Sequence, residues 1–280
     1  MFRKLFLFIA ILALATLACG FKLPKAATPG PDVTDKISVE TLDSDNINLK
    51  LSFGAGEMTL SPGAEKLVEG TATYNYSAFK PVVSADNENI HIGMSETNFN
   101  AFPVTQDLKN IWNLKLGSAP MGLTIESGAY KGHFEFGGLA LYGLAIKDGA
   151  ADVTLNFSEP NQTEMSVFHY ETGASNVKMT GLANANFGLL DFASGAGDYT
   201  LDFSGDLKRD ASIKISSGLS NIIIVVPESV NAVVTVDSGA SNINAGSGWS
   251  QNGKIYTQKS EGPTLTFVIS IGAGNVTLTK

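Results

Sequence analysis

Cysteine is almost absent from the 280-residue sequence, in which Cys19 is the only one. Without a second cysteine the chain cannot form an internal disulfide, so its stability has to come from a hydrophobic core. A chain of this length is long enough to bury such a core.

Basic residues and histidine are also scarce. The sequence has 19 Lys and Arg residues against 27 Asp and Glu, a net charge of −8 and three histidines. Its only arginines are Arg3 and Arg209. Because the phosphates of nucleic acids are bound by lysine and arginine, we expect no nucleic acid partner.

Recognisable catalytic patterns are missing as well. The sequence has no Gly-x-Ser-x-Gly motif, and its glycine motifs lack the third glycine and the following helix of a dinucleotide site. We therefore predict a non-enzymatic protein without a cofactor. A carbohydrate-active enzyme on a β-helix scaffold stays as an alternative, because a pair of facing carboxylates cannot be recognised from sequence alone.

A long apolar run occurs only near the N-terminus, at residues 5–18, after two basic residues. The run is shorter than the roughly 20 residues that span a bilayer and is typical of a signal peptide. Cys19 follows it directly, which resembles the lipobox of bacterial lipoproteins. We predict a lipoprotein signal peptide at 1–18 and lipid attachment at Cys19; an ordinary cleaved signal peptide is the alternative.

Residues 19–34 contain prolines and small residues without periodicity, which predicts a flexible tether. The tether and the lipid would hold the folded part at the cell membrane or cell surface, outside the cytoplasm. The membrane is therefore one expected partner, through the lipidated Cys19.

A glycine motif recurs along the chain, as SGAGDYTLDF at residues 194–203 and as SFGAGEMTL, GASNV, GASNI and SIGAGNVTL elsewhere. Apolar or aromatic residues stand five and three places before its first glycine and four and six places after it. This alternation predicts a strand, a turn and a second strand with one buried face. The first glycines are Gly54, Gly149, Gly173, Gly195, Gly218, Gly239 and Gly272.

From Gly128 onward the motifs recur about every 22 residues, with one longer step before Gly272. All-strand repeats of this length predict an all-β fold, a right-handed parallel β-helix or solenoid whose coils stack on one another. We predict the solenoid over residues 107–280, with a hairpin insertion near 246–263. Residues 35–106 are predicted to form an N-terminal β region or cap.

Asn, Asp or Glu stands three places after each of these seven first glycines. Asn and Asp suit a turn, because their side chains bond nearby backbone groups. Stacked in register, such side chains can form a hydrogen-bonded ladder.

The segments LSFGAGEMTL, WNLKLGSAPMGLTIESGA and GLANANFGLLDFASGAGDYTLDFSG, with the GAGNVTL ending, resemble the toast-rack domain family of bacterial envelope proteins. That family is similar to adhesin-like β-helix domains, and the resemblance covers nearly all of the chain after the signal. It implies an extracytoplasmic β-helical module and supplies no catalytic residues. Relatives in envelope-stress responses have membrane helices and partner kinases, neither of which is visible in this sequence.

Acidic residues form the weakest candidate site. Asp198, Asp202, Asp206 and Asp210 recur at every fourth position, and calcium prefers oxygen ligands. The sequence has no calcium-loop pattern, so solvated acidic turns are the favoured interpretation and we expect no metal.

Two further groups are candidates for binding. Tyr74, Tyr76, Trp249 and Tyr256 could stack on sugar rings, although packing against the core is the favoured interpretation. Ile223 and Val225 lie at outward positions that are mostly polar in the other repeats. They are either covered by the neighbouring insertion, which we expect, or exposed for partner contact.

These observations predict a lipid-anchored extracytoplasmic β-solenoid that acts as an adhesin-like or envelope-associated binding module. Its expected partner is a cell-wall polymer or an envelope protein. A structural or envelope-stress signalling subunit is a further alternative.

Overall fold

The computed structural model describes residues 28–95 and 107–280 of the chain, and their regular structure is almost entirely strand. The predicted signal peptide, Cys19 and the end of the predicted N-terminal region lie outside these residues. Within them no α-helix occurs, and the 3-10 helices are η1 (Ser77–Phe79) and η2 (Leu182–Ala185). No helix in the described ranges is long and apolar enough to cross a membrane.

The strands belong to one open 15-stranded sheet with both parallel and antiparallel pairs. In chain order they are β1 (Val33–Val39), β2 (Ile47–Pro62), β3 (Val68–Tyr74), β4 (Pro81–Asp86), β5 (Asn89–Met94), β6 (Asn110–Leu116), β7 (Met121–Glu135), β8 (Leu141–Asn156), β9 (Met165–Thr180), β10 (Phe187–Asp202), β11 (Ala211–Val225), β12 (Asn231–Ala245), β13 (Ser250–Asn252), β14 (Ile255–Gln258) and β15 (Thr264–Thr279). The prediction of an all-β fold is confirmed.

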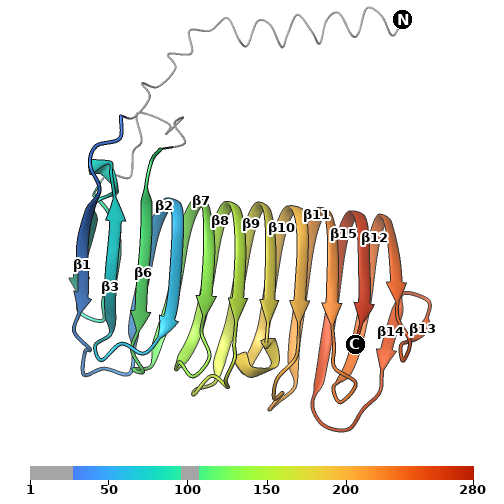
Figure 1. Cartoon of the computed structure of the whole chain (residues 1–280). Helices are drawn as coiled ribbons and strands as arrows, with labels where there is room; N and C mark the ends of the chain where they lie inside the picture. The colour runs from blue at the N-terminus through green and yellow to red at the C-terminus, as the bar shows by residue number, and fades with distance from the viewer. Residues whose placement is uncertain (1–27, 96–106) are drawn as a thin grey trace, which may run out of the picture.

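Eight of these strands are long and bend near their middle. Strands β2, β7 to β12 and β15 have 15 or 16 residues each. Each bends at the first glycine of its motif, so that a first arm before the glycine faces a second arm after it (Figure 1). The bent strands lie side by side in parallel register, which forms two facing layers of arms.

The bends lie in a column because only glycine fits there. A Cβ atom on Gly173 would lie 2.4 Å from the carbonyl oxygen of Gly149, and one on Gly195 would lie 2.5 Å from that of Gly173. Backbone at this distance leaves no room for a side chain, so the neighbouring strands require glycine. The column runs through Gly54, Gly128, Gly149, Gly173, Gly195, Gly218, Gly272 and Gly239.

The core lies between the two layers of arms. The apolar positions predicted on each side of the seven first glycines are buried there, except in β12. In β12, Val234 and Val236 are buried, whereas Ile243 is only partly buried and Ala245 is exposed. These two side chains are less covered because the second arm of β12 lies at the end of its layer.

The order of the last strands differs from their order in the sequence. Strand β15 pairs with β11 on one side and with β12 on the other. It is therefore inserted between β11 and β12, although it follows β12 in the sequence. The hairpin of β13 and β14 pairs with the first arm of β12 rather than with β15. The 22-residue repeat does not predict which of β12 and β15 lies next to β11, because both strands carry the same motif.

The other end of the sheet consists of shorter strands, of which β5 and β6 pair in parallel with β2, whereas β1, β3 and β4 pair in antiparallel fashion. Strand β6 pairs with the second arm of β2 and is followed by β3 and β1, while β5 and β4 continue from the first arm of β2. Strand β2 also pairs with β7 from Ile47 to Leu60, across both of its arms. Hydrogen bonding therefore continues without a break from the predicted N-terminal region into the repeats.

Candidate functional site

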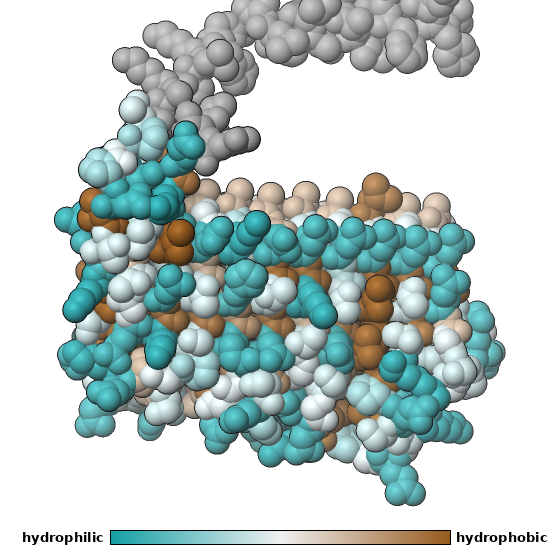
Figure 2. All heavy atoms as spheres, in the orientation of Figure 1, coloured by the Kyte–Doolittle hydropathy of each residue, from teal (hydrophilic) through white to brown (hydrophobic). Residues whose placement is uncertain are grey.

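A stripe of apolar side chains crosses the outer face of the second arm of β11. Alternate residues face outward there, and among them Leu219 is 63% exposed, Ile223 is 40% exposed and Val225 is half-buried. We call Leu219, Ile223 and Val225 the β11 stripe. Figure 2 shows a matching line of brown atoms that interrupts a mainly teal and white face.

The neighbouring strands carry polar or small residues in the same rows. Ile223 lies between Thr200 of β10 and Thr277 of β15, and Val225 lies between Asp202 and Thr279. The row of Leu219 holds alanine in every other bent strand, namely Ala55, Ala129, Ala150, Ala174, Ala196, Ala240 and Ala273.

Of the three stripe residues, Ile223 and Val225 are predicted from the sequence, whereas Leu219 is not. The signal was present, because the residue after each aligned glycine is alanine except at Gly218. The expectation that the insertion covers this pair is wrong. The β13–β14 hairpin pairs with the first arm of β12, on the other layer, and leaves Ile223 exposed.

A ladder of side-chain hydrogen bonds links β11, which carries the stripe, to its neighbouring strands. Asn242 donates to Asn275 (3.3 Å), Asn275 donates to Asn221 (2.7 Å), and Asn221 donates to Asp198 (2.8 Å). Asn221 lies between Leu219 and Ile223 on β11. The predicted ladder is thus present across β12, β15, β11 and β10, and it holds the stripe in register with its neighbours.

A half-buried carboxyl group, that of Asp148, lies beside the glycine column. Asp148 accepts hydrogen bonds from Tyr170 (2.8 Å), Ser175 (3.3 Å), Tyr130 (3.5 Å) and Thr172. Burial raises the pKa of Asp148 above its ordinary value of 3.8, and the donated hydrogen bonds oppose this only in part. Burial also raises the pKa of Tyr170 well above its ordinary range. The four donors Tyr130, Tyr170, Thr172 and Ser175 are buried, each 6% exposed or less.

The Asp148 carboxyl group makes folding stability depend on pH. Since its pKa is higher in the folded chain than in the unfolded chain, the folded state holds the proton more tightly, and stability falls as pH rises above 3.8 through the raised pKa. We expect Asp148→Asn to remove this part of the pH dependence in urea unfolding measured over a pH series. Asp152→Asn, at an exposed carboxyl group on the same strand, is the control. An unchanged slope in Asp148→Asn would contradict the prediction.

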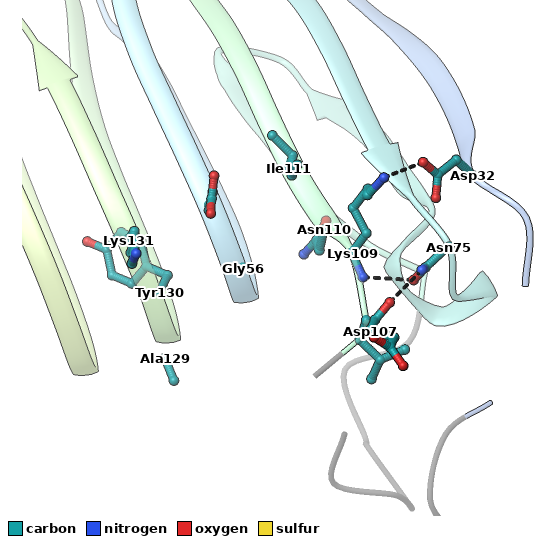
Figure 3. Close-up of a pocket in the computed structure, with 12 residues that line it drawn as sticks. Asp32, Gly56, Asn75, Asp107, Lys109, Asn110, Ile111, Ala129, Tyr130 and Lys131 are labelled. Atoms are coloured by element: carbon teal, nitrogen blue, oxygen red, sulfur yellow. Dashed lines mark hydrogen bonds and ion pairs between the residues drawn. The ribbon is translucent and has the colours of Figure 1, made fainter. Parts of the chain in front are cut away.

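A groove of about 700 Å³ lies where β6 begins beside the bends of β2 and β7 (Figure 3). The side chain of Asn75 accepts from the backbone nitrogen of Lys109 (2.8 Å) and donates to the carbonyl of Asp107 (2.7 Å). Lys109 pairs with Asp32, and Asn110 donates to the carbonyl of Ala55 (2.8 Å). These side chains join the strand ends to one another, which is a structural role.

The four acidic candidates for metal binding are engaged separately. Asp198 accepts from Asn221, Asp202 accepts from the backbone of Ser204 (2.8 Å), and Asp210 accepts from the backbone of Thr264 (2.7 Å). Asp206 lies 3.9 Å from Lys208. Within residues 28–95 and 107–280, no group of three or more His, Cys, Asp or Glu side chains is placed to hold a metal ion. The interpretation as acidic turns therefore fits these contacts.

The aromatic candidates do not come together. Tyr74 is 6% exposed and Tyr256 is 5% exposed, so both belong to the core. Tyr76 packs edge-on against Phe79 with ring centroids 5.4 Å apart, and Trp249 packs against the core. Tyr74 lies on β3 and Tyr256 on β14, near opposite ends of the sheet. This placement favours packing over a sugar-stacking surface.

The described residues define an all-β protein of stacked, glycine-bent strands that presents an apolar stripe on one face. Residues 28–180 match the family model described as the N-terminal domain of toast_rack, DUF2154. This match covers more than half of the chain, and the chain belongs to the toast-rack family.

Solved structures that resemble this chain have low sequence identity to it and TM-scores below 0.5. A candidate cell adhesion protein from Clostridium sporogenes is 18% identical, with 89% of this chain and 99% of that chain covered and a TM-score of 0.47. A candidate adhesin from Bacteroides fragilis is 12% identical, with 89% and 97% covered and a TM-score of 0.47. A candidate lipid-binding protein from Parabacteroides distasonis is 11% identical, with 88% and 97% covered and a TM-score of 0.38. No match to a curated protein was found.

Proposed function

We propose that the protein is a non-enzymatic, lipid-anchored binding module of the cell envelope that contacts its partner through the β11 stripe. The observation that carries this proposal is the exposure of Leu219 and Ile223 in rows that are otherwise small or polar. Exposed apolar side chains that lie together are typical of contact surfaces. The lipid on Cys19 would hold the module outside the cytoplasm, at the membrane or cell surface.

The scaffold of this module is proposed to be a right-handed parallel β-solenoid with coils of about 22 residues. The glycine column and the parallel register of the bent strands support this interpretation. Such a scaffold suits contact by its outer faces, since each coil adds one row of side chains to a long flat surface.

The chemistry of the stripe favours an envelope protein as the partner. Leucine, isoleucine and valine bury well against another apolar surface, whereas sugar rings stack on exposed aromatic side chains. Tyr74 and Tyr256 are buried and unavailable for stacking. A cell-wall polymer is the alternative partner, and the experiment below distinguishes the two.

Replacing each stripe residue by the residue type that the other strands carry in the same row should weaken binding without harming the fold. We expect Leu219→Ala with Ile223→Thr and Val225→Thr to weaken binding of the full-length chain to envelope vesicles by about tenfold or more. A loss of roughly 1.4 kcal/mol corresponds to tenfold, and central apolar contacts commonly exceed it. All variants keep Cys19, so insertion of the lipid affects them equally.

Val268→Thr provides the matched control. Val268 is 55% exposed on the first arm of β15, between Lys214 and Thr235, so it tests an apolar side chain on the opposite layer.

Protease treatment of the vesicles should remove stripe-dependent binding if the partner is a protein. Equal binding by the triple variant and the parent chain would refute the role of the stripe.

A further inference from the structure

The C-terminal end of the sheet is stepped. The layer of first arms extends beyond β12 by two strands, β14 and β13. The layer of second arms ends at β12, whose residues 240–245 pair with β15 on one side, and no described strand pairs with them on the other side. One layer is therefore two strands longer than the other at this end, where the hairpin projects beyond β12 (Figure 1).

The side chains at the step are incompletely covered. Ile243 is only partly buried, although Ile222 and Val276 in the same row are 1% and 0% exposed. The hydroxyl oxygen of Ser241 and Nε1 of Trp249 are buried there without a hydrogen-bond partner. Such unpaired atoms also occur away from this end, in Asn110, Trp112, Ser127 and Arg209. The partial burial of Ile243 is thus the observation that distinguishes the step. This end therefore has the features of a layer that lacks its last strands.

The edge of the step also lacks the usual protection against pairing. Residues 238–253 contain no charged residue and no proline. The edge strands at the other end are protected, because β1 carries Asp35 and Lys36 and β4 begins at Pro81. Charged residues and proline on edge strands prevent pairing with other chains. The unprotected edge is thus at the stepped end.

We propose that a second copy of this chain fills the step, with a two-fold axis parallel to the strands. Such an axis exchanges the two layers and leaves the direction of each strand unchanged. The hairpin of each copy then supplies the two strands that the other copy lacks. The step is self-complementary, as the interface of a two-fold dimer requires.

Strand direction agrees with this arrangement. Strand β13 runs antiparallel to β14, and β14 runs antiparallel to the first arm of β12. Strand β13 therefore runs parallel to the first arm and opposite to the second arm. After the two-fold rotation, β13 of one copy lies antiparallel to the second arm of β12 in the other copy, and both edges can form ladder hydrogen bonds.

The register places one pair of residues side by side. Asn252 pairs with Ile255, and Ile255 pairs with Thr235, so Asn252 lies level with Thr235. Thr235 stands four places before Gly239 and Asn244 stands five places after it, at matching heights on the two facing arms. Asn252 of one copy and Asn244 of the other should therefore be neighbours on the outer face of the joined sheet.

Disulfide trapping tests this geometry. Full-length chains with Asn244→Cys and with Asn252→Cys, carrying different tags, are mixed and oxidised. We expect a disulfide-linked heterodimer from the mixture and a dimer mass for the parent chain by sedimentation. Thr154→Cys, in the same row as Asn244 but on β8, replaces Asn244→Cys in the control mixture. The thermal unfolding of each cysteine variant is compared with that of the parent chain.

Three results would overturn the proposal. One is cross-linking no stronger than in the Thr154→Cys control. Another is a dominant link between two copies of Asn244→Cys, which would place the axis differently. The third is a monomeric parent chain at the concentrations used for trapping. None of these results bears on the β11 stripe, because Ile223 and Leu219 lie on β11, away from the step.

Discussion

A Gly173→Ala substitution is expected to lower the free energy of unfolding by about 3 kcal/mol or more. The added Cβ atom would lie 2.4 Å from the carbonyl oxygen of Gly149. That oxygen belongs to the backbone of β8 and cannot move away without shifting a strand that is paired on both sides. Relief of this contact would therefore require β8 and the strands paired with it to shift together.

Gly143→Ala provides the control for this prediction. Gly143 also lies on β8, but no atom lies within 4 Å of the position that its Cβ would take. Alanine there should change stability by less than about 1 kcal/mol, in the stabilising direction, because it restricts the unfolded chain. Urea unfolding of both variants gives the comparison. Equal losses of stability at the two positions would show that close backbone packing is not the cause.

An Asn161→Ala substitution is expected to cost about 3 kcal/mol. Asn161 is 4% exposed; its side-chain oxygen accepts from the backbone nitrogen of Leu141 (2.9 Å), and its nitrogen donates to the carbonyls of Leu141 and Thr163 (both 2.8 Å). Alanine leaves those backbone groups unpaired in a buried place, and each such group costs about 1–3 kcal/mol. The start of β8 should then become the least protected part of the central sheet in hydrogen exchange.

Gln162→Ala is the matched control for Asn161→Ala. Gln162 is exposed, and its side chain donates only to the nearby carbonyl of Pro160 (2.9 Å). We expect its free energy of unfolding to stay within about 0.5 kcal/mol of the parent value, as is usual at surface positions. A comparable loss at both positions would mean that the loop as a whole, and not the buried amide, is the source of stability.

The repeat could be predicted from the sequence because each of its parts has a local cause. Glycine is required where backbones approach closely, and the alternating apolar residues are required where one face of each arm is buried. The order of β12 and β15 has no such cause. Both contain the same motif, and their order depends on pairing between distant residues and on where the hairpin lies.

The candidate site could be predicted in part for a similar reason. Ile223 and Val225 break a row of polar residues, and that exception is visible in the aligned repeats. Their exposure was not predictable, because a sequence does not tell which arm of β12 the β13–β14 hairpin pairs with. The buried amide of Asn161 was also missed, since its partners are backbone groups and carry no sequence signal.

The position of β15 inside the sheet has a consequence for biosynthesis. Strands β8 to β11 each pair with the strand that precedes them in the chain, and β7 pairs with the earlier β2, so each can join the fold as soon as it emerges. Strand β12 cannot, because both of its neighbours, β14 and β15, follow it in the chain. The end of the sheet that presents the step is therefore completed only after β15 has been made, later than the stack of β7 to β11.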